Sequence, residues 1–239
     1  MPWRKAALYL LLAVPLSSPG AGLPGREGVV VTPEQEGLAG EADAASQGTV
    51  DDEQLENRPL LRPGEVLEVI PGVVVTQHSG SGKANQYFLR GFNLDHGTDF
   101  AVHVDSMPLN LPSHGHGQGY ADLNFVIPEL VEHIHYRKGP YYADEGDFSA
   151  AGTAHLHLKR SLDPGFAQIS TGSYGYRRGL LGGSRAVEGG SLLGALELGQ
   201  QDGPWLVQEN LRKLSGVLRY ANGDEQSGVT LTGMLYSSR

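Results

Sequence analysis

The 239-residue chain carries a formal charge of −9 at pH 7, because 27 acidic residues outnumber 18 basic ones. Nucleic-acid binding needs a concentrated basic face, so this balance argues against nucleic acid as a partner. The sequence has no cysteine, which excludes disulfide frameworks, thiol nucleophiles and thiolate metal sites.

The N-terminus predicts an export signal. Arg4 and Lys5 precede an apolar run at 6–14, and small residues follow through Gly22. This order is typical of a secretory signal peptide, with a buried N-terminal helix as the alternative. The run is too short for a membrane-spanning helix, which needs about 20 apolar residues. We therefore assign residues 1–22 to a signal peptide.

Residues 23–57 are acidic, small and polar, which is typical of a flexible leader. One β-prone patch interrupts the leader and has no core of its own to join. It is either an incidental apolar run or a strand that pairs with a sheet edge on another protein. The patch contains Glu27, Val29, Val30, Val31 and Thr32.

Residues 58–160 alternate short predicted helices and strands around a Gly-rich loop at 111–119. Mixed short elements over about 100 residues imply a small α+β domain. The expected helices lie at 65–70 and 128–131, and the expected strands at 73–76, 87–90, 100–104, 134–137 and 154–158.

After Pro164 the sequence alternates apolar with small or polar residues, with turn signals at Gly189-Gly190 and Asn222-Gly223. Strands of about 9–11 residues with this period are typical of a transmembrane β-barrel. A soluble β-sandwich fits the same pattern nearly as well. The expected strands are 166–174, 177–187, 192–201, 213–221 and 228–236.

Five short motifs follow one another in residues 58–159. They are Leu67–Val73, Leu89–Phe92, Asp105–Pro108, Val131–Pro140 and Gly152–Leu158. In this order they resemble the plug domain of TonB-dependent outer-membrane receptors. Two loops depart from the family pattern: Ser106 stands where the family has Gly, and residues 142–148 replace its usual Tyr-Gly.

The resemblance implies an α+β plug domain followed by the first antiparallel strands of a transmembrane β-barrel. Such barrels have about 22 strands. About 75 residues remain after the plug, enough for about five strands, so we expect an incomplete barrel and a partial sequence. The expected division is 1–22 signal peptide, 23–57 leader, 58–160 plug and 161–239 barrel strands.

The resemblance also implies a receptor for energy-coupled uptake of a siderophore, another metal chelate or a metal ion. It places the protein in the outer membrane of a Gram-negative bacterium, without a cofactor. The expected partners are lipid, an extracellular ligand and the inner-membrane protein TonB, which would bind the patch at 27–32 as a TonB box. The alternatives are a receptor for an organic nutrient, such as cobalamin or a glycan, and a structural outer-membrane protein. An enzyme is not expected, because a flexible loop with His114, His116 and Asp122 offers no rigid catalytic arrangement.

The histidines indicate the ligand most directly. His114 and His116 lie in the Gly-rich loop, and imidazoles two residues apart can share Zn²⁺ or Cu²⁺. Hydrogen bonding within a structured loop is the alternative for both. Asp95, His96 and Asp99 could complete the shell of a metal ion, although the sequence does not fix their distance.

Arg90 and Gln118 are further ligand-binding candidates. For Arg90, an ion pair with a carboxylate such as Glu132 is the favoured alternative. The two His-x-His pairs at 133/135 and 155/157 each point to one face of a strand, where we expect structural roles.

Overall fold

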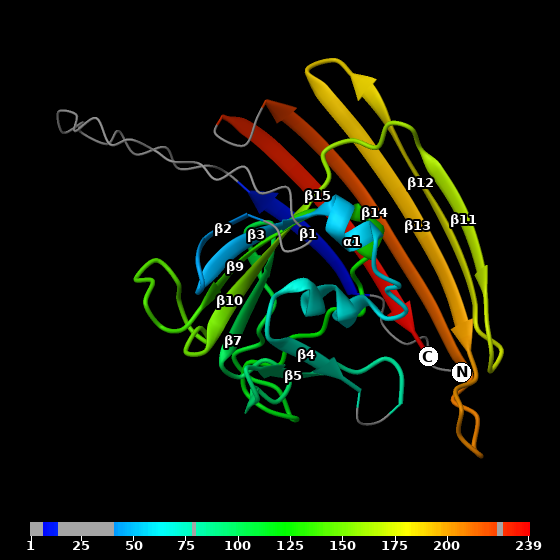
Figure 1. The fold of residues 1–239 in the computed structure, drawn as a ribbon. Coiled ribbons are helices and arrows are strands. Elements are labelled where there is room, and N and C mark those ends of the chain that lie inside the picture. The colour runs from blue at the N-terminus through cyan, green and yellow to red at the C-terminus, as the bar shows by residue number, and fades with distance from the viewer. Residues whose placement is uncertain (1–6, 14–40, 78–79, 224–226) are drawn as a thin grey trace.

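The computed structural model describes the backbone of residues 7–13 and 41–43 and the backbone and side chains of 44–77, 80–223 and 227–239. An α+β domain lies beside a curved antiparallel sheet, which we call the wall (Figure 1). The described chain therefore has two parts, and contacts between them position the functional residues.

The main sheet of the α+β domain has six strands, and β10 and β7 are its parallel pair. From edge to edge the strands are β2 (Glu41–Ala44), β3 (Gln47–Asp51), β9 (Val131–Lys138), β10 (Gly152–Leu158), β7 (Phe100–Val104) and β8 (Met107–Pro108).

A small second sheet and three short helices cover one face of the main sheet (Figure 1). Within the described ranges, no helix is both long and apolar enough to cross a membrane. The small sheet consists of β4 (Val73–Thr76), β5 (Gln86–Leu89) and β6 (Phe92–Asn93). The three short helices are α1 (Asp52–Glu56) and the 3₁₀-helices η1 (Pro63–Val69) and η2 (Pro128–Leu130).

Strict alternation gives the main sheet two different faces. Val102, Leu156 and Ile134 point into the hydrophobic core, where they are fully buried. The intervening residues of the same strands form the opposite face, on which the histidine side chains are half-buried. We call it the histidine face, and its histidines are His103, His133, His135, His155 and His157.

The predicted boundary between leader and plug at residue 58 is wrong. Residues 41–57 form β2, β3 and α1, and β3 pairs with β9 over five positions. Val50 and Leu55 supply core side chains that are 0% and 4% exposed. The acidic residues of this segment suggest a solvated leader. Two of them, Asp52 and Glu56, instead pair with Lys159 of the domain.

The wall confirms the five strands predicted after Pro164. Each strand pairs with the next in sequence. The strands are β11 (Phe166–Thr171), β12 (Arg177–Val187), β13 (Gly190–Gln201), β14 (Leu211–Gly223) and β15 (Gly228–Ser238).

The apolar run assigned to the signal peptide forms strand β1 (Ala7–Ala13), which pairs antiparallel with the edge of β15. A sheet edge presents unpaired backbone groups that accept any extended segment. The pairing does not test the export role, so the signal peptide stays a prediction.

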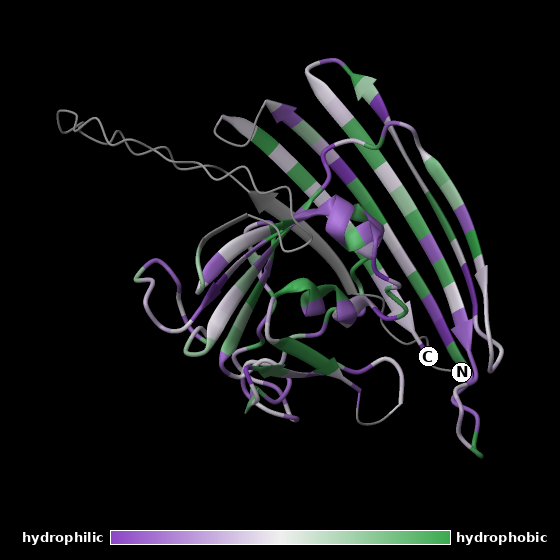
Figure 2. Ribbon diagram, in the orientation of Figure 1, coloured by the Kyte–Doolittle hydropathy of each residue, from purple (hydrophilic) through white to green (hydrophobic). Residues whose placement is uncertain are grey.

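The side chains of the wall alternate in the sense opposite to a soluble sheet. Leu181, Leu198 and Leu218 point away from the α+β domain and are 61%, 56% and 59% exposed, whereas Glu197 and Arg219 point toward it and are 4% exposed. Figure 2 shows the hydrophobic bands along these strands. An apolar outer face and a polar inner face are the pattern of a membrane barrel. A sandwich would bury its apolar faces against each other, so that alternative is excluded.

Charged side chains join the wall to the domain. Arg178 of β12 donates to both carboxylate oxygens of Glu129 in η2, at 2.5 and 2.8 Å, and to Glu197 of β13 at 3.0 Å. Lys213 of β14 donates to the same Glu197 at 3.0 Å. The charges of the inner wall are therefore paired with each other and with η2.

A second ion pair fixes the other part of the inner wall. Arg219 of β14 pairs with Asp105, which follows β7, and donates to Thr232 of β15 at 3.0 Å. Asp105 also accepts the backbone N–H of Leu158 at 3.1 Å. The wall therefore contacts the edge of the main sheet as well as η2.

Replacing Arg178 by alanine leaves the carboxylates of Glu129 and Glu197 partly buried without their shared cation. We expect R178A to lower the free energy of unfolding by about 3 kcal/mol, measured by denaturant titration in detergent. R185A is the matched control, because Arg185 is exposed on the same strand. Equal stability of R178A and R185A would contradict a role for this ion pair.

Candidate ligand-binding site

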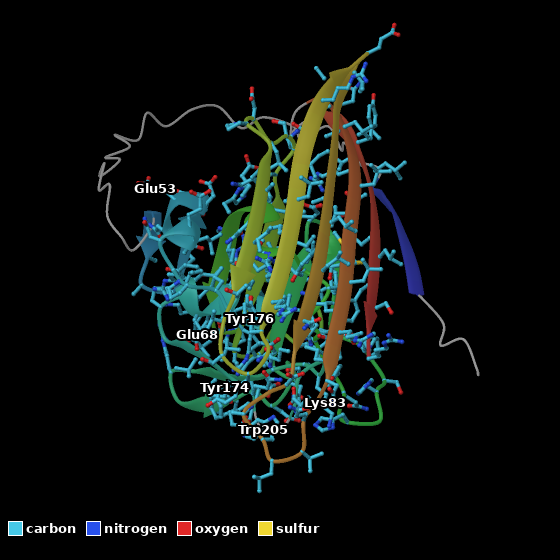
Figure 3. All side chains as sticks on the ribbon, turned by 90° about the vertical axis from the view of Figure 1, so that its right-hand side faces the viewer. Glu53, Glu68, Lys83, Tyr174, Tyr176 and Trp205 are labelled. Carbon is cyan, nitrogen blue, oxygen red and sulfur yellow. The ribbon has the colours of Figure 1, made fainter. Side chains whose placement is uncertain are left out.

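The two ends of the wall differ in the length of their connections. At one end β13 and β14 are joined by residues 202–210, and β11 and β12 by 172–176. We call this the long-loop end. In Figure 3, Trp205 and Tyr174 mark it, with Lys83 of the α+β domain beside them and Glu53 of α1 at the opposite end.

Residues 80–82, between β4 and β5, dock against this end of the wall. The backbone N–H of Ser81 donates to both oxygens of Glu209 at 3.2 Å. Gln201 at the end of β13 donates from Nε2 to the Ser81 hydroxyl at 3.0 Å. The α+β domain therefore presents residues 80–85 at the long-loop end, together with the loops that carry His96 and Tyr120 and contact these residues.

His96 and His116 form a contact that the sequence did not predict as a pair. Their Nε2 atoms lie 2.8 Å apart, and their rings meet edge to face with centroids 4.3 Å apart. His96 is 4% exposed, whereas His116 is exposed. The pair therefore runs from the protein interior to the surface.

Two backbone carbonyls fix the ring of His96. Its Nδ1 lies 3.0 Å from the carbonyl oxygens of both Ala84 and Asn85. A carbonyl oxygen only accepts, so Nδ1 donates, and the other ring nitrogen, Nε2, faces His116. Histidines that bind metal ions through one ring nitrogen commonly donate from the other to a backbone carbonyl, as His96 does here.

His114 has a different role from His116. Its ring stacks on Tyr120 with centroids 3.9 Å apart, and its Nδ1 accepts the backbone N–H of His116 at 3.1 Å. Tyr120 in turn accepts the backbone N–H of Ala84 at 2.8 Å, and burial raises the pKa of its hydroxyl. His114 therefore shapes the loop, and His116 faces His96.

Asn110 holds the site together. Its Nδ2 donates to the carbonyl oxygens of Gly97, Phe100 and Gly119 at 2.8 to 3.0 Å, and its Oδ1 accepts the backbone N–H of Val102. Asn110 is 8% exposed. It ties the segment after His96 to the end of the Gly-rich loop. Sequence reasoning missed it, although a single amide between two leucines was a usable signal.

Of the other oxygen-bearing candidates, Asp95 is the one that lies at the pair. Its Oδ1 is 3.6 Å from Nε2 of His96. Asp122 instead accepts from the backbone and side-chain nitrogens of Asn124 at 2.8 Å. Gln118 is exposed on the loop, where its backbone carbonyl oxygen accepts from the Thr98 hydroxyl.

Arg90 does not belong to this site. It follows β5, whereas Ala84 and Asn85, which hold His96, precede that strand. The predicted buried pair with Glu132 is also wrong, because Arg90 is exposed and donates to the backbone carbonyl oxygen of Ala45 at 3.4 Å. The backbone explains this position: Arg90 has φ +53° in the tight turn between β5 and β6, which directs it away from the core.

The comparison with protein families agrees with the motifs. A family model described as TonB-dependent Receptor Plug Domain matches residues 41–153. The chain contains a TonB-dependent receptor plug domain. The match begins at β2, which supports the correction of the leader boundary, and the α+β domain is the plug from here on.

Solved structures share the arrangement of plug and wall. The copper transporter OprC has 19% identity and a TM-score of 0.60, and the match covers 84% of this chain and 32% of OprC. The siderophore receptor PirA from Pseudomonas aeruginosa has 20% identity and a TM-score of 0.56, with 82% and 36% covered. The ferric yersiniabactin uptake receptor FyuA from Yersinia pestis has 16% identity and a TM-score of 0.58, and the match covers 81% of this chain and 31% of FyuA. These likenesses show the fold, and the chain spans about a third of the length of each structure.

Replacing Asn110 by alanine removes the donor of three buried carbonyl groups. We expect N110A to lower the free energy of unfolding by about 2 kcal/mol and to speed amide hydrogen exchange in residues 111–120. N57A is the matched control, because Asn57 Nδ2 donates to one exposed carbonyl, that of Glu53, and the backbone of Asn57 has an ordinary negative φ of −75°. Unchanged exchange in N110A would show that the loop is held by other contacts.

Proposed function

We propose that this chain is the first part of an outer-membrane receptor for energy-coupled uptake of a metal ion or metal chelate. The observation that carries the proposal is the His96–His116 pair at the long-loop end of a plug. The wall beside that plug turns its apolar face outward, as lipid requires.

The orientation follows from the loops. Outer-membrane barrels have short periplasmic turns and longer extracellular loops. On this basis the long-loop end faces the outside medium, and α1 faces the periplasm. Ligand would then reach His116 first, because His116 is exposed and His96 lies behind it.

The ligand class follows from the donor atoms. Two imidazoles with a nearby carboxylate, Asp95, suit Zn²⁺ or Cu²⁺ better than Mg²⁺ or Ca²⁺. OprC is a copper transporter and PirA a siderophore receptor, so the shared fold serves copper in one of those proteins and a siderophore in the other. A receptor for an organic nutrient such as cobalamin or a glycan is the competing proposal.

Energy coupling is proposed to act through the leader. Glu27, Val29, Val30, Val31 and Thr32 lie outside the described residues. Their β-prone sequence suits strand addition to TonB, which would pull the chain from the periplasm. The pull would reach the plug at Glu41, where β2 is the edge strand of the main sheet. An edge strand can be peeled off one backbone pair at a time, which needs less force than shearing the whole sheet.

Deletion of the receptor gene should slow growth under limitation of zinc, copper or iron. In the intact gene, H116Q and H96A should lower accumulation of that metal at least about tenfold, because each removes a nitrogen ligand. H114A should retain most uptake, since His114 shapes the loop. Equal outer-membrane levels of the variants are the folding control. A strain whose growth depends on cobalamin or a glycan instead would favour the competing proposal.

The leader makes a separate prediction. V30P removes a backbone N–H that a paired strand needs, so it should abolish energy-dependent uptake while ligand binding to whole cells remains. L38P places a proline in the same acidic leader outside the patch and should leave uptake intact. Uptake by V30P at the level of L38P would argue against strand pairing by residues 27–32.

A further inference from the structure

We propose that the plug has a second metal site, in which His103, His155 and Glu145 bind one divalent transition-metal ion on the histidine face. Among the described residues, these are the three histidine and carboxylate side chains whose ligand atoms all lie within 4.8 Å of one another. The site shares no residue with the His96–His116 pair.

Sheet topology places the two histidines together. β7 and β10 are parallel neighbours, and their register sets His103 opposite His155. The two rings stack with centroids 4.4 Å apart and planes 2° apart. Rotation of a histidine ring about its last torsion is soft, so a metal ion could turn both nitrogens toward itself without moving the strands.

Glu145 reaches this pair from the loop between β9 and β10. One oxygen, Oε1, accepts from Arg137 and from Thr153, both at 3.1 Å, which fixes the orientation of the carboxylate. Nε2 of His155 lies 3.1 Å from both Oε1 and Oε2. Carboxylate ligands in metal sites are held by outer hydrogen bonds of this kind.

His103 supplies an independent observation. Its Nδ1 is buried and has no hydrogen-bond partner among the described residues. Buried polar atoms in folded proteins almost always have a partner, so this nitrogen calls for a ligand.

The spacing suits zinc-like ions. Two ligand atoms about 2.1 Å from a tetrahedral metal lie about 3.4 Å apart. The 3.1 Å between His155 Nε2 and Glu145 Oε2 is close to this value. Two histidines and one glutamate leave a fourth position open, which allows an ion to enter and leave rather than be locked in place.

The site lies on the side of the plug away from the wall. The opposite face of the main sheet packs in one core with Leu180, Leu193 and Val217 of the wall, so the histidine face points away from these strands (Figure 1). If the proposed uptake function holds, this site would receive ions beyond the His96–His116 pair. Metal binding itself does not depend on that function.

The test is a Zn²⁺ titration of the purified full chain in detergent, in competition with a chromophoric chelator. E145Q, which keeps the shape of the side chain, and H155A should each weaken one class of site at least about tenfold. Co²⁺ in the same site should give the visible absorption of a tetrahedral complex, and this absorption should be lost in both variants.

Matched controls separate metal binding from folding. D144N removes the other carboxylate bound to Arg137, and H133A removes one ring of the stacked pair His133–His157 on the same face. Both should bind like the parent chain. H96A should affect a different class of site, so failure here and failure of the proposed function are distinguishable. Binding by E145Q and H155A equal to that of the parent chain would overturn the proposal.

Discussion

The polarity of the wall is the constraint on which the rest of the structure depends. Strands whose apolar side chains face outward must turn polar side chains inward, and inward charges need partners. Arg178 and Arg219 find carboxylates on the plug, in η2 and after β7. The outward apolar face of the wall therefore determines where the plug sits. The ion pairs fix this position more sharply than apolar packing would, because the hydrogen bonds between a guanidinium and a carboxylate depend on both distance and direction.

The candidate site combines an irregular sequence with a rigid structure. The loop at 111–119 is rich in glycine, yet Asn110 ties its end to Gly97 and two carbonyls hold the ring of His96. Backbone groups, rather than neighbouring side chains, do most of this positioning. A loop built in this way presents His116 at the surface with little loss of conformational freedom when a ligand binds.

The eight histidines among the described residues fall into groups with different surroundings. At the long-loop end, one imidazole is buried and held by carbonyls, and another stacks on a tyrosine. On the histidine face, rings pair across neighbouring strands, and Glu145 reaches one such pair from a loop. The role open to each histidine therefore depends on which oxygen-bearing groups lie beside its ring.

The sequence by itself determined the elements with a clear local cause. The period of two after Pro164 predicted the wall, and the Pro-Gly and Lys-Gly-Pro motifs predicted the plug. Tertiary structure decided what depends on residues far apart in the chain. Residues 41–57 look like leader until Val50 and Leu55 meet the core, and Arg90 looks buried until its turn points outward. His96 meets His116, and His103 meets His155, because strand pairing and backbone hydrogen bonds join distant segments, and no local pattern encodes such distances.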